Sequence, residues 1–135
     1  MRTLVVDDDQ VIGTFLSAVL SQYGECVLED DGKKALGTFV KSIYDGEIFD
    51  LILLDIMMPE IDGLSLLKII RELEAKWNIG REERSKIMMV TAVDSPIEAG
   101  ESFIFGDVDD YIVKPVSVNE LKSKMEGLFG TDDPV

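Results

Sequence analysis

Five short apolar runs, separated by longer amphipathic stretches, are the feature that most limits how this chain can fold. In the central runs, apolar residues follow one another without alternation, which is typical of strands buried on both faces of a parallel sheet. The runs are TLVVD (3–7), CVLE (26–29), LILLD (51–55), KIMMVT (86–91) and DYIVK (110–114). They predict five strands.

The stretches between these runs repeat apolar residues at intervals of three and four, which is the spacing of one helical face. We expect five helices, over residues 11 to about 24, 32–44, 64 to 77–80, 95 onward and 118–129. In the first, six apolar side chains should face the core: Val11, Ile12, Phe15, Leu16, Val19 and Leu20. Strands and helices that alternate in this way predict an α/β fold, a doubly wound parallel sheet between two helical layers in a three-layer α/β/α sandwich.

Composition and charge narrow the possible functions. The 135 residues are 46% hydrophobic and 30% charged, so we expect one globular domain over residues 1–130 and a polar tail or linker stub over 131–135. A net charge of -14 argues against direct nucleic-acid binding. Without a membrane-length apolar run or a signal peptide, a cytoplasmic protein is expected, with no membrane contact. The chain has no histidine, the usual general base, and a single cysteine, Cys26.

Polar residues close the predicted strands. Three aspartates at 7–9 end the first, and Asp55, Thr91 and Lys114 end the third, fourth and fifth. Ligands of open parallel sheets bind beyond the carboxyl ends of the strands, so these side chains should share one rim. Neighbouring carboxylates repel one another unless a cation intervenes, and oxygen ligands suit Mg²⁺. With a lysine and a hydroxyl to hold phosphoryl oxygens, the set predicts a carboxylate nucleophile for phosphoryl transfer.

The motifs LVVDDD, LILLDIMMPEIDG, VTA and DYIVKP, in this order along essentially the whole chain, resemble the receiver domain of two-component response regulators. The resemblance implies a flavodoxin-like sheet of strand order 2-1-3-4-5. It also implies that Asp55 accepts a phosphoryl group from a histidine kinase or a histidine phosphotransfer protein. Asp7 and Asp8, with Asp55 and the backbone carbonyl of Met57, would hold the Mg²⁺.

The same resemblance implies a conformational switch. Thr91 and Lys114 would hold the phosphoryl oxygens, and Tyr111 matches the aromatic residue that turns inward on phosphorylation. Pro115 would follow a cis peptide bond. The fourth helix, fifth strand and fifth helix would form the face that contacts a downstream protein target. The chain would then be a signalling switch whose only chemistry is its own phosphorylation and dephosphorylation, not a metabolic enzyme.

Two alternatives remain open. A haloacid-dehalogenase-like phosphatase would use Asp7 as nucleophile and Asp9 as acid–base residue, although its motif normally has a threonine where this chain has Val11. A helix cap is the simpler role for Asp9. The second alternative is a receiver-like docking module that is never phosphorylated, against which the intact set of acids, Thr91 and Lys114 argues.

Three further features concern the lifetime of the phosphorylated state and two stretches that lie between the predicted strands. The resemblance implies that the residues two past Asp55 and two past Thr91 influence the access of water to the phosphoryl group. These residues are Met57 and Val93, whose side chains cannot orient a water by hydrogen bonding, so we expect a phosphorylated state that lives longer than one with polar or acidic residues there. The charged stretch 77–86 predicts a solvated loop extension. The glycine-containing stretch 95–111 predicts a short fourth helix next to Tyr111.

Overall fold

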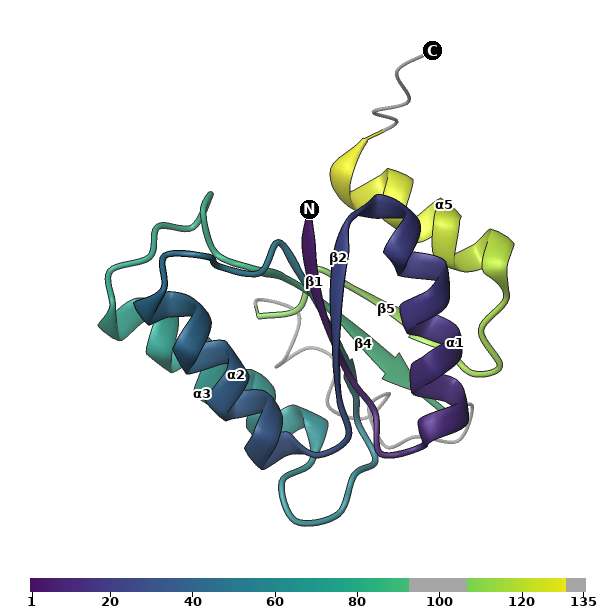
Figure 1. Cartoon of the computed structure of the whole chain (residues 1–135), viewed down its shortest axis with the longest axis horizontal. Helices are drawn as coiled ribbons and strands as arrows, with labels where there is room; N and C mark the ends of the chain where they lie inside the picture. The colour runs from purple at the N-terminus through teal and green to yellow at the C-terminus, as the bar shows by residue number, and fades with distance from the viewer. Residues whose placement is uncertain (93–106, 131–135) are drawn as a thin grey trace.

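A five-stranded parallel sheet of order β2-β1-β3-β4-β5 forms the centre of the molecule and confirms the predicted fold (Figure 1). The computed structural model describes residues 1–92 and 107–130. The elements are β1 (Arg2–Val6), α1 (Gln10–Leu20), the 3-10 turn η1 (Ser21–Tyr23), β2 (Glu25–Glu29), α2 (Gly32–Tyr44), β3 (Leu51–Asp55), α3 (Gly63–Lys76), β4 (Lys86–Thr91), β5 (Asp110–Val113) and α5 (Val118–Phe129). The predicted helix from residue 95 and the predicted tail lie outside the described residues.

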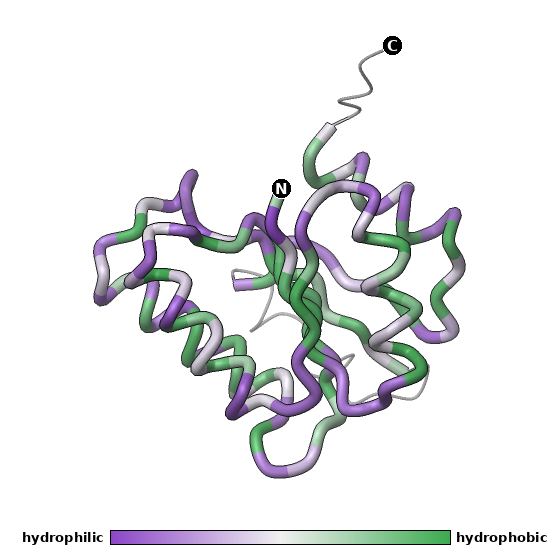
Figure 2. The backbone as a smooth tube through the Cα atoms, viewed as in Figure 1, coloured by the Kyte–Doolittle hydropathy of each residue, from purple (hydrophilic) through white to green (hydrophobic). Residues whose placement is uncertain are grey.

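The sheet separates two apolar clusters. α2 and α3 cover one face and α1 and α5 the other (Figure 1). Adjacent residues of the central strand point to opposite clusters: Leu54 packs with Phe39 of α2, and Leu53 packs with Leu16 of α1. All five residues of β3 are buried, which explains its unbroken apolar sequence. Figure 2 shows the most hydrophobic segments running through the centre of the fold.

The first helix differs from its prediction on one side. Leu16 is buried as expected, but Val11 is 80% exposed and Phe15 is 36% exposed. The side turned to the sheet includes Gly13, where a Cβ atom would lie 2.8 Å from a methyl group of Leu28. Ile12, Leu16, Val19 and Leu20 pack in the cluster on this face as predicted, and the prediction was wrong for Val11 and Phe15.

Each described α-helix begins at a side chain that caps its free backbone N–H groups. The capping residues of α1, α2, α3 and α5 are Asp9, Asp31, Asp62 and Ser117. Asp9 accepts from the backbone N–H groups of Val11 and Ile12, at 2.9 and 3.2 Å, which confirms its predicted role as a cap. Because each helix follows a strand, these caps fix the loops that surround the carboxyl ends of the strands.

The predicted loop between α3 and β4 is hydrogen-bonded and mostly exposed. Ile79 N–H donates to the Glu74 carbonyl (2.9 Å), and Arg84 N–H donates to the Gly80 carbonyl (3.0 Å). Ser85, at its end, is fully buried. Among the described residues, no helix is long and apolar enough to cross a membrane.

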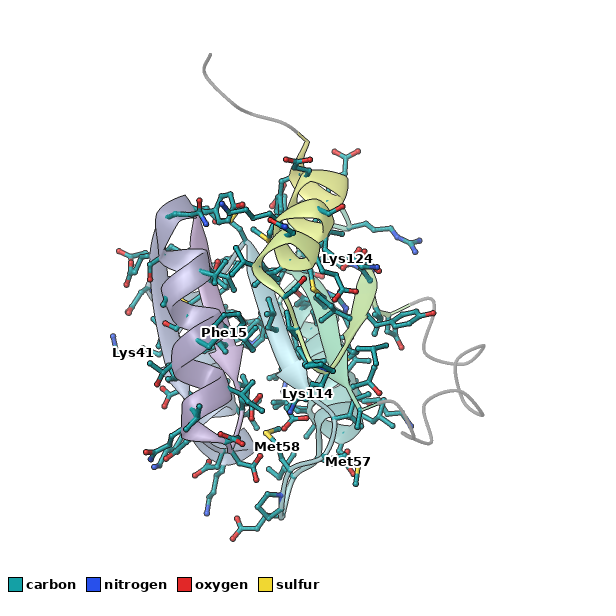
Figure 3. The ribbon with its side chains drawn as sticks, turned by 90° about the vertical axis from the view of Figure 1, so that its right-hand side faces the viewer. Phe15, Lys41, Met57, Met58, Lys114 and Lys124 are labelled. Carbon is teal, nitrogen blue, oxygen red and sulfur yellow. The ribbon has the colours of Figure 1, made fainter. Side chains whose placement is uncertain are left out.

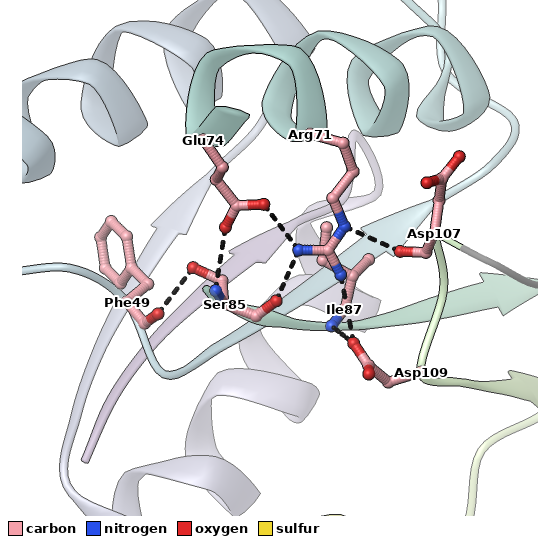
Figure 4. Close-up of polar contacts among 7 residues, drawn as sticks. All are labelled: Phe49, Arg71, Glu74, Ser85, Ile87, Asp107 and Asp109. Atoms are coloured by element: carbon pink, nitrogen blue, oxygen red, sulfur yellow. Dashed lines mark hydrogen bonds and ion pairs between the residues drawn. The ribbon is translucent and has the colours of Figure 1, made fainter. Parts of the chain in front are cut away.

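A buried ionic cluster that the sequence did not predict ties α3 to the beginnings of β4 and β5 (Figure 4). Arg71 Nη1 donates to Glu74 Oε1 and to the Ser85 carbonyl, both at 2.7 Å. Its Nε donates to the Asp107 carbonyl (2.8 Å) and its Nη2 to Asp109 Oδ2 (3.2 Å). The cluster fixes the point at which the chain enters β5, the strand that carries Tyr111 and leads to Lys114.

Candidate functional site

The carboxyl ends of three strands bring together two buried aspartates and a lysine. Asp7 follows β1, Asp55 ends β3 and Lys114 follows β5. Lys114 Nζ lies 3.5 Å from Asp7 Oδ2 and 3.5 Å from Asp55 Oδ2. Figure 3 shows Lys114 at this end of the sheet, above the loop that contains Met57 and Met58. The juxtaposition is the one that the strand ends predicted.

Asp55 sits where ionisation is costly. Its side chain is 5% exposed. Burial, and next the negative charge of Asp7, raise the pKa of Asp55 to about 6, while the Lys114 ammonium and the Met57 backbone N–H act in the opposite direction. That N–H donates to Asp55 Oδ1 at 3.2 Å. At neutral pH the group is therefore mainly a carboxylate, available as a nucleophile but held at a cost.

Asp7 carries a buried oxygen that has no hydrogen-bond partner among the described residues. The residue is 1% exposed; its Oδ1 accepts from the Asp9 backbone N–H at 2.9 Å. Within the described part of the chain, Oδ2 has no hydrogen-bond partner, and Lys114 Nζ lies 3.5 Å from it. A buried anionic oxygen without a donor is unfavourable unless a cation approaches it. Asp7 therefore has the environment expected of a metal ligand.

The acidic side chains at this rim fit a small divalent cation. One carboxylate oxygen from each of Asp7, Asp8 and Asp55 can be chosen so that all three lie within 4.8 Å of one another. Asp8 is exposed and the other two are buried. Hard oxygen donors of this number suit Mg²⁺, which keeps several waters. These three residues could hold the ion, and the predicted contribution of the Met57 carbonyl stays a prediction.

The predicted switch residues lie on the two neighbouring strands. Thr91, the last residue of β4, is 2% exposed, and its hydroxyl donates to the Ala92 carbonyl at 3.1 Å. Tyr111 on β5 is 40% exposed and therefore points outward. The Lys114–Pro115 peptide bond, just past β5, is cis. Of the two predicted tuning residues, Met57 has a 62% exposed side chain and Val93 lies outside the described residues.

The loop after Asp55 is held close to the strand by a glycine. A Cβ atom at Gly63 would lie 2.3 Å from the Asp55 carbonyl oxygen, so only glycine fits without a shift of the backbone. The Gly63 N–H also donates to the Ile56 carbonyl at 3.0 Å. Within the same loop Glu60 has a φ of 65°, in the left-handed region that non-glycine residues rarely adopt. The first turn of α3 thus packs against the backbone of Asp55 itself.

One contact near the switch was not predicted from the sequence. Lys124 on α5 places its Nζ 5.8 Å from the centre of the Tyr111 ring and 3.1 Å from Asp110 Oδ1. A lysine on an amphipathic helix normally indicates a solvated face, so the sequence carries no signal for this contact. It depends on how α5 packs beside β5.

The chain matches the family described as the response regulator receiver domain over residues 3–126. It is 34% identical over 124 residues to the uncharacterized transcriptional regulatory protein YcbL of Bacillus subtilis. The aligned region covers 91% of this chain and 48% of that protein. It is 30% identical over 131 residues to the transcriptional regulatory protein CiaR of Streptococcus pneumoniae, covering 96% and 51%. This chain thus spans about half the length of both curated relatives.

A solved structure agrees with the sequence match. The chemotaxis protein CheY4 of Vibrio cholerae superposes with a TM-score of 0.74 at 26% identity, covering 94% of this chain and 97% of that one. The family match over residues 3–126 includes Asp7, Asp55 and Lys114. The chain belongs to the response regulator receiver domain family.

Proposed function

We propose that Asp55 is the phosphoacceptor of this receiver domain and takes a phosphoryl group from a histidine kinase or a histidine phosphotransfer protein. The observation that carries the proposal is the position of the Asp55 carboxylate, 3.5 Å from Lys114 and beside the unsatisfied Oδ2 of Asp7. A nucleophile, a cation and an acidic pair that fits Mg²⁺ are thus gathered at one rim.

The transfer follows from these groups. A carboxylate oxygen of Asp55 attacks phosphorus in line, a P–O bond forms while the P–N bond of the phosphohistidine breaks, and the imidazole leaves with the electron pair. Mg²⁺ held by Asp7, Asp8 and Asp55 would neutralise phosphoryl charge at the rim. The Lys114 ammonium contacts both Asp7 and Asp55 from one position. It can therefore also bind the oxygens of a phosphoryl group on Asp55 while it stays close to Asp7. The product is an acyl phosphate on Asp55.

The response to phosphorylation involves Thr91 and Tyr111. The Thr91 hydroxyl donates to the neighbouring Ala92 carbonyl, a partner it can exchange for a phosphoryl oxygen. Its movement toward Asp55 opens space into which the outward ring of Tyr111 can turn. The face formed by the predicted fourth helix, β5 and α5 would then contact a downstream protein target differently in the two states. The chain acts as a switch and does not turn over a separate substrate.

The role of Asp9 supports this proposal over the phosphatase alternative. An acid–base residue needs a carboxylate that is free to exchange a proton with the substrate. The Asp9 carboxylate instead accepts hydrogen bonds from the Val11 and Ile12 N–H groups as the cap of α1. Hydrogen bonds of this kind tie the side chain to the first turn of the helix.

The test is phosphorylation from acetyl phosphate in Mg²⁺, read by intact-protein mass spectrometry. The unaltered chain should gain one phosphoryl group, Asp55→Asn should gain none, and Asp62→Asn, which removes one negative charge from the same loop, should behave as the parent. Undiminished labelling of Asp55→Asn would refute the assignment. If the parent is neither labelled nor able to bind beryllofluoride in Mg²⁺, the chain is a docking module. Turnover of p-nitrophenyl phosphate would instead indicate the phosphatase.

A further inference from the structure

The exposed ring of Tyr111 lies beside Lys124 of α5. Asp110 Oδ1 accepts a hydrogen bond from the Tyr111 backbone N–H at 2.8 Å. The same oxygen forms an ion pair with Lys124 Nζ at 3.1 Å. The same ammonium lies 5.8 Å from the centre of the Tyr111 ring. An ammonium within about 6 Å of a ring centre is attracted to the electrons of that ring. Asp110 therefore holds the Lys124 ammonium beside the ring.

The two contacts of Lys124 depend differently on the position of Tyr111. The ion pair between Lys124 and Asp110 does not depend on the position of the Tyr111 ring. The contact with the ring exists only while the ring is outward. Both partners are partly shielded from water, since the Lys124 side chain is 33% exposed and that of Asp110 is 28% exposed. Lys124 therefore interacts differently with the two states of the switch, which is what is needed to bias an equilibrium between them.

We propose that Lys124 is a positioning residue that holds Tyr111 outward and so opposes the switch at Asp55. The inference rests on the proposed function, because it concerns the inward movement of Tyr111 that accompanies occupation of the Asp55 site. A partly exposed contact between a cation and a ring corresponds to about a two- to fivefold change in an equilibrium constant. A ligand that favours the inward state should bind more tightly by that factor when the contact is removed.

The experiment measures the dissociation constant of beryllofluoride in saturating Mg²⁺ by calorimetry, with the whole chain. Lys124→Met removes the charge and keeps most of the aliphatic stem. Lys122→Met removes the same charge from the same helix and is the matched control. Lys124→Met should bind about two- to fivefold more tightly than the parent, and Lys122→Met should bind as the parent does. In a Tyr111→Ala background, Lys124→Met should have no effect.

A second readout does not depend on the phosphoryl site. With ¹³C-labelled tyrosine, the ring signals of Tyr111 should shift in Lys124→Met without ligand and should not shift in Lys122→Met. Unchanged signals, unchanged or weaker binding by Lys124→Met, or an equal gain in the Tyr111→Ala background would each overturn the inference. If the parent is phosphorylated on Asp55 and binds beryllofluoride, such a result leaves the proposed function standing. If the parent does neither, the proposed function and this inference both fall.

Discussion

Replacing Asp55 by asparagine should stabilise the protein at neutral pH. Burial and the charge of Asp7 raise the pKa of Asp55 from 3.8 to about 6 in the folded state. Between these two values the folded chain binds more protons than the unfolded chain, so the free energy of unfolding falls as the pH rises, and it stays lowered above pH 6. Asparagine cannot ionise, and its side-chain oxygen can still accept the Met57 N–H. The free energy of unfolding of Asp55→Asn should therefore not fall with pH through ionisation at this position.

The magnitude follows from the two pKa values. One pH unit between them corresponds to about 1.36 kcal/mol. The advantage of Asp55→Asn should thus be about 1 kcal/mol at pH 4.5 and about 3 kcal/mol at pH 7.5, where Asp55 is almost fully ionised in both states. The pH dependence separates this cause from a change in packing, which would act equally at both pH values.

The assay is urea unfolding at several pH values, followed by the fluorescence of Trp77, the single tryptophan. Asp62→Asn is the control, since it removes the same charge from an exposed helix cap that asparagine can replace. Added Mg²⁺ should stabilise the parent more than Asp55→Asn, because the ion binds the carboxylates of the folded state. An Asp55→Asn variant no more stable than the parent at pH 7.5, or an advantage that does not grow with pH, would refute the reasoning.

Three further predictions follow from the packing around the site. Arg71→Met leaves Glu74, whose side chain is 3% exposed, without its ionic partner and should lower the free energy of unfolding by about 3–5 kcal/mol. In urea unfolding, the double variant with Glu74→Met should recover part of that loss. A cost of under about 1 kcal/mol for Arg71→Met alone would contradict a buried charge. Gly63→Ala places a methyl group 2.3 Å from the Asp55 carbonyl and should cost about 1–3 kcal/mol. Gly127→Ala on α5, where a Cβ atom would have no neighbour within 4 Å, should instead raise the midpoint temperature of thermal unfolding. Equal effects of Gly63→Ala and Gly127→Ala on this temperature would be inconsistent with close packing at Gly63. Lys114→Met removes the ammonium that favours the Asp55 carboxylate, so a carboxyl-carbon NMR titration should give a higher pKa for Asp55 than in the parent; an unchanged or lower value would argue against the ion pair.

The strands could be predicted because the relevant signals are local, whereas their order was implied by the resemblance to the receiver family. The unbroken apolar residues of β3 report burial on both faces, and the residue that ends each strand must lie at the rim of a parallel sheet. The approach of Asp7, Asp55 and Lys114 follows from that rule without knowledge of side-chain packing. Their roles in phosphoryl transfer remain predictions, supported by membership of the receiver family.

The features that could not be predicted depend on how elements pack. Val11 and Phe15 have the spacing of an inward face but are exposed, whereas Gly13 of the same helix is buried beside Leu28. Arg71 carries a charge that, on an amphipathic helix, normally indicates solvent exposure, yet it is buried with Glu74. Contacts between elements distant in sequence decide these cases, and a single sequence contains no record of them.

The position of Lys114 between two acids depends on how β5 is fixed at both ends. Arg71 holds the entry to β5 through the Asp107 carbonyl and Asp109, while the Lys114 N–H at its exit donates to the Thr91 carbonyl at 2.7 Å. At the other end of α3, Gly63 packs against Asp55. The helix therefore connects the backbone of Asp55 to the start of the strand that carries Tyr111. Buried carboxylates at the rim are unfavourable by themselves, so a bound cation that relieves their repulsion, or a modification of Asp55 that changes the charge there, alters the free energy of the rim, as a switch requires.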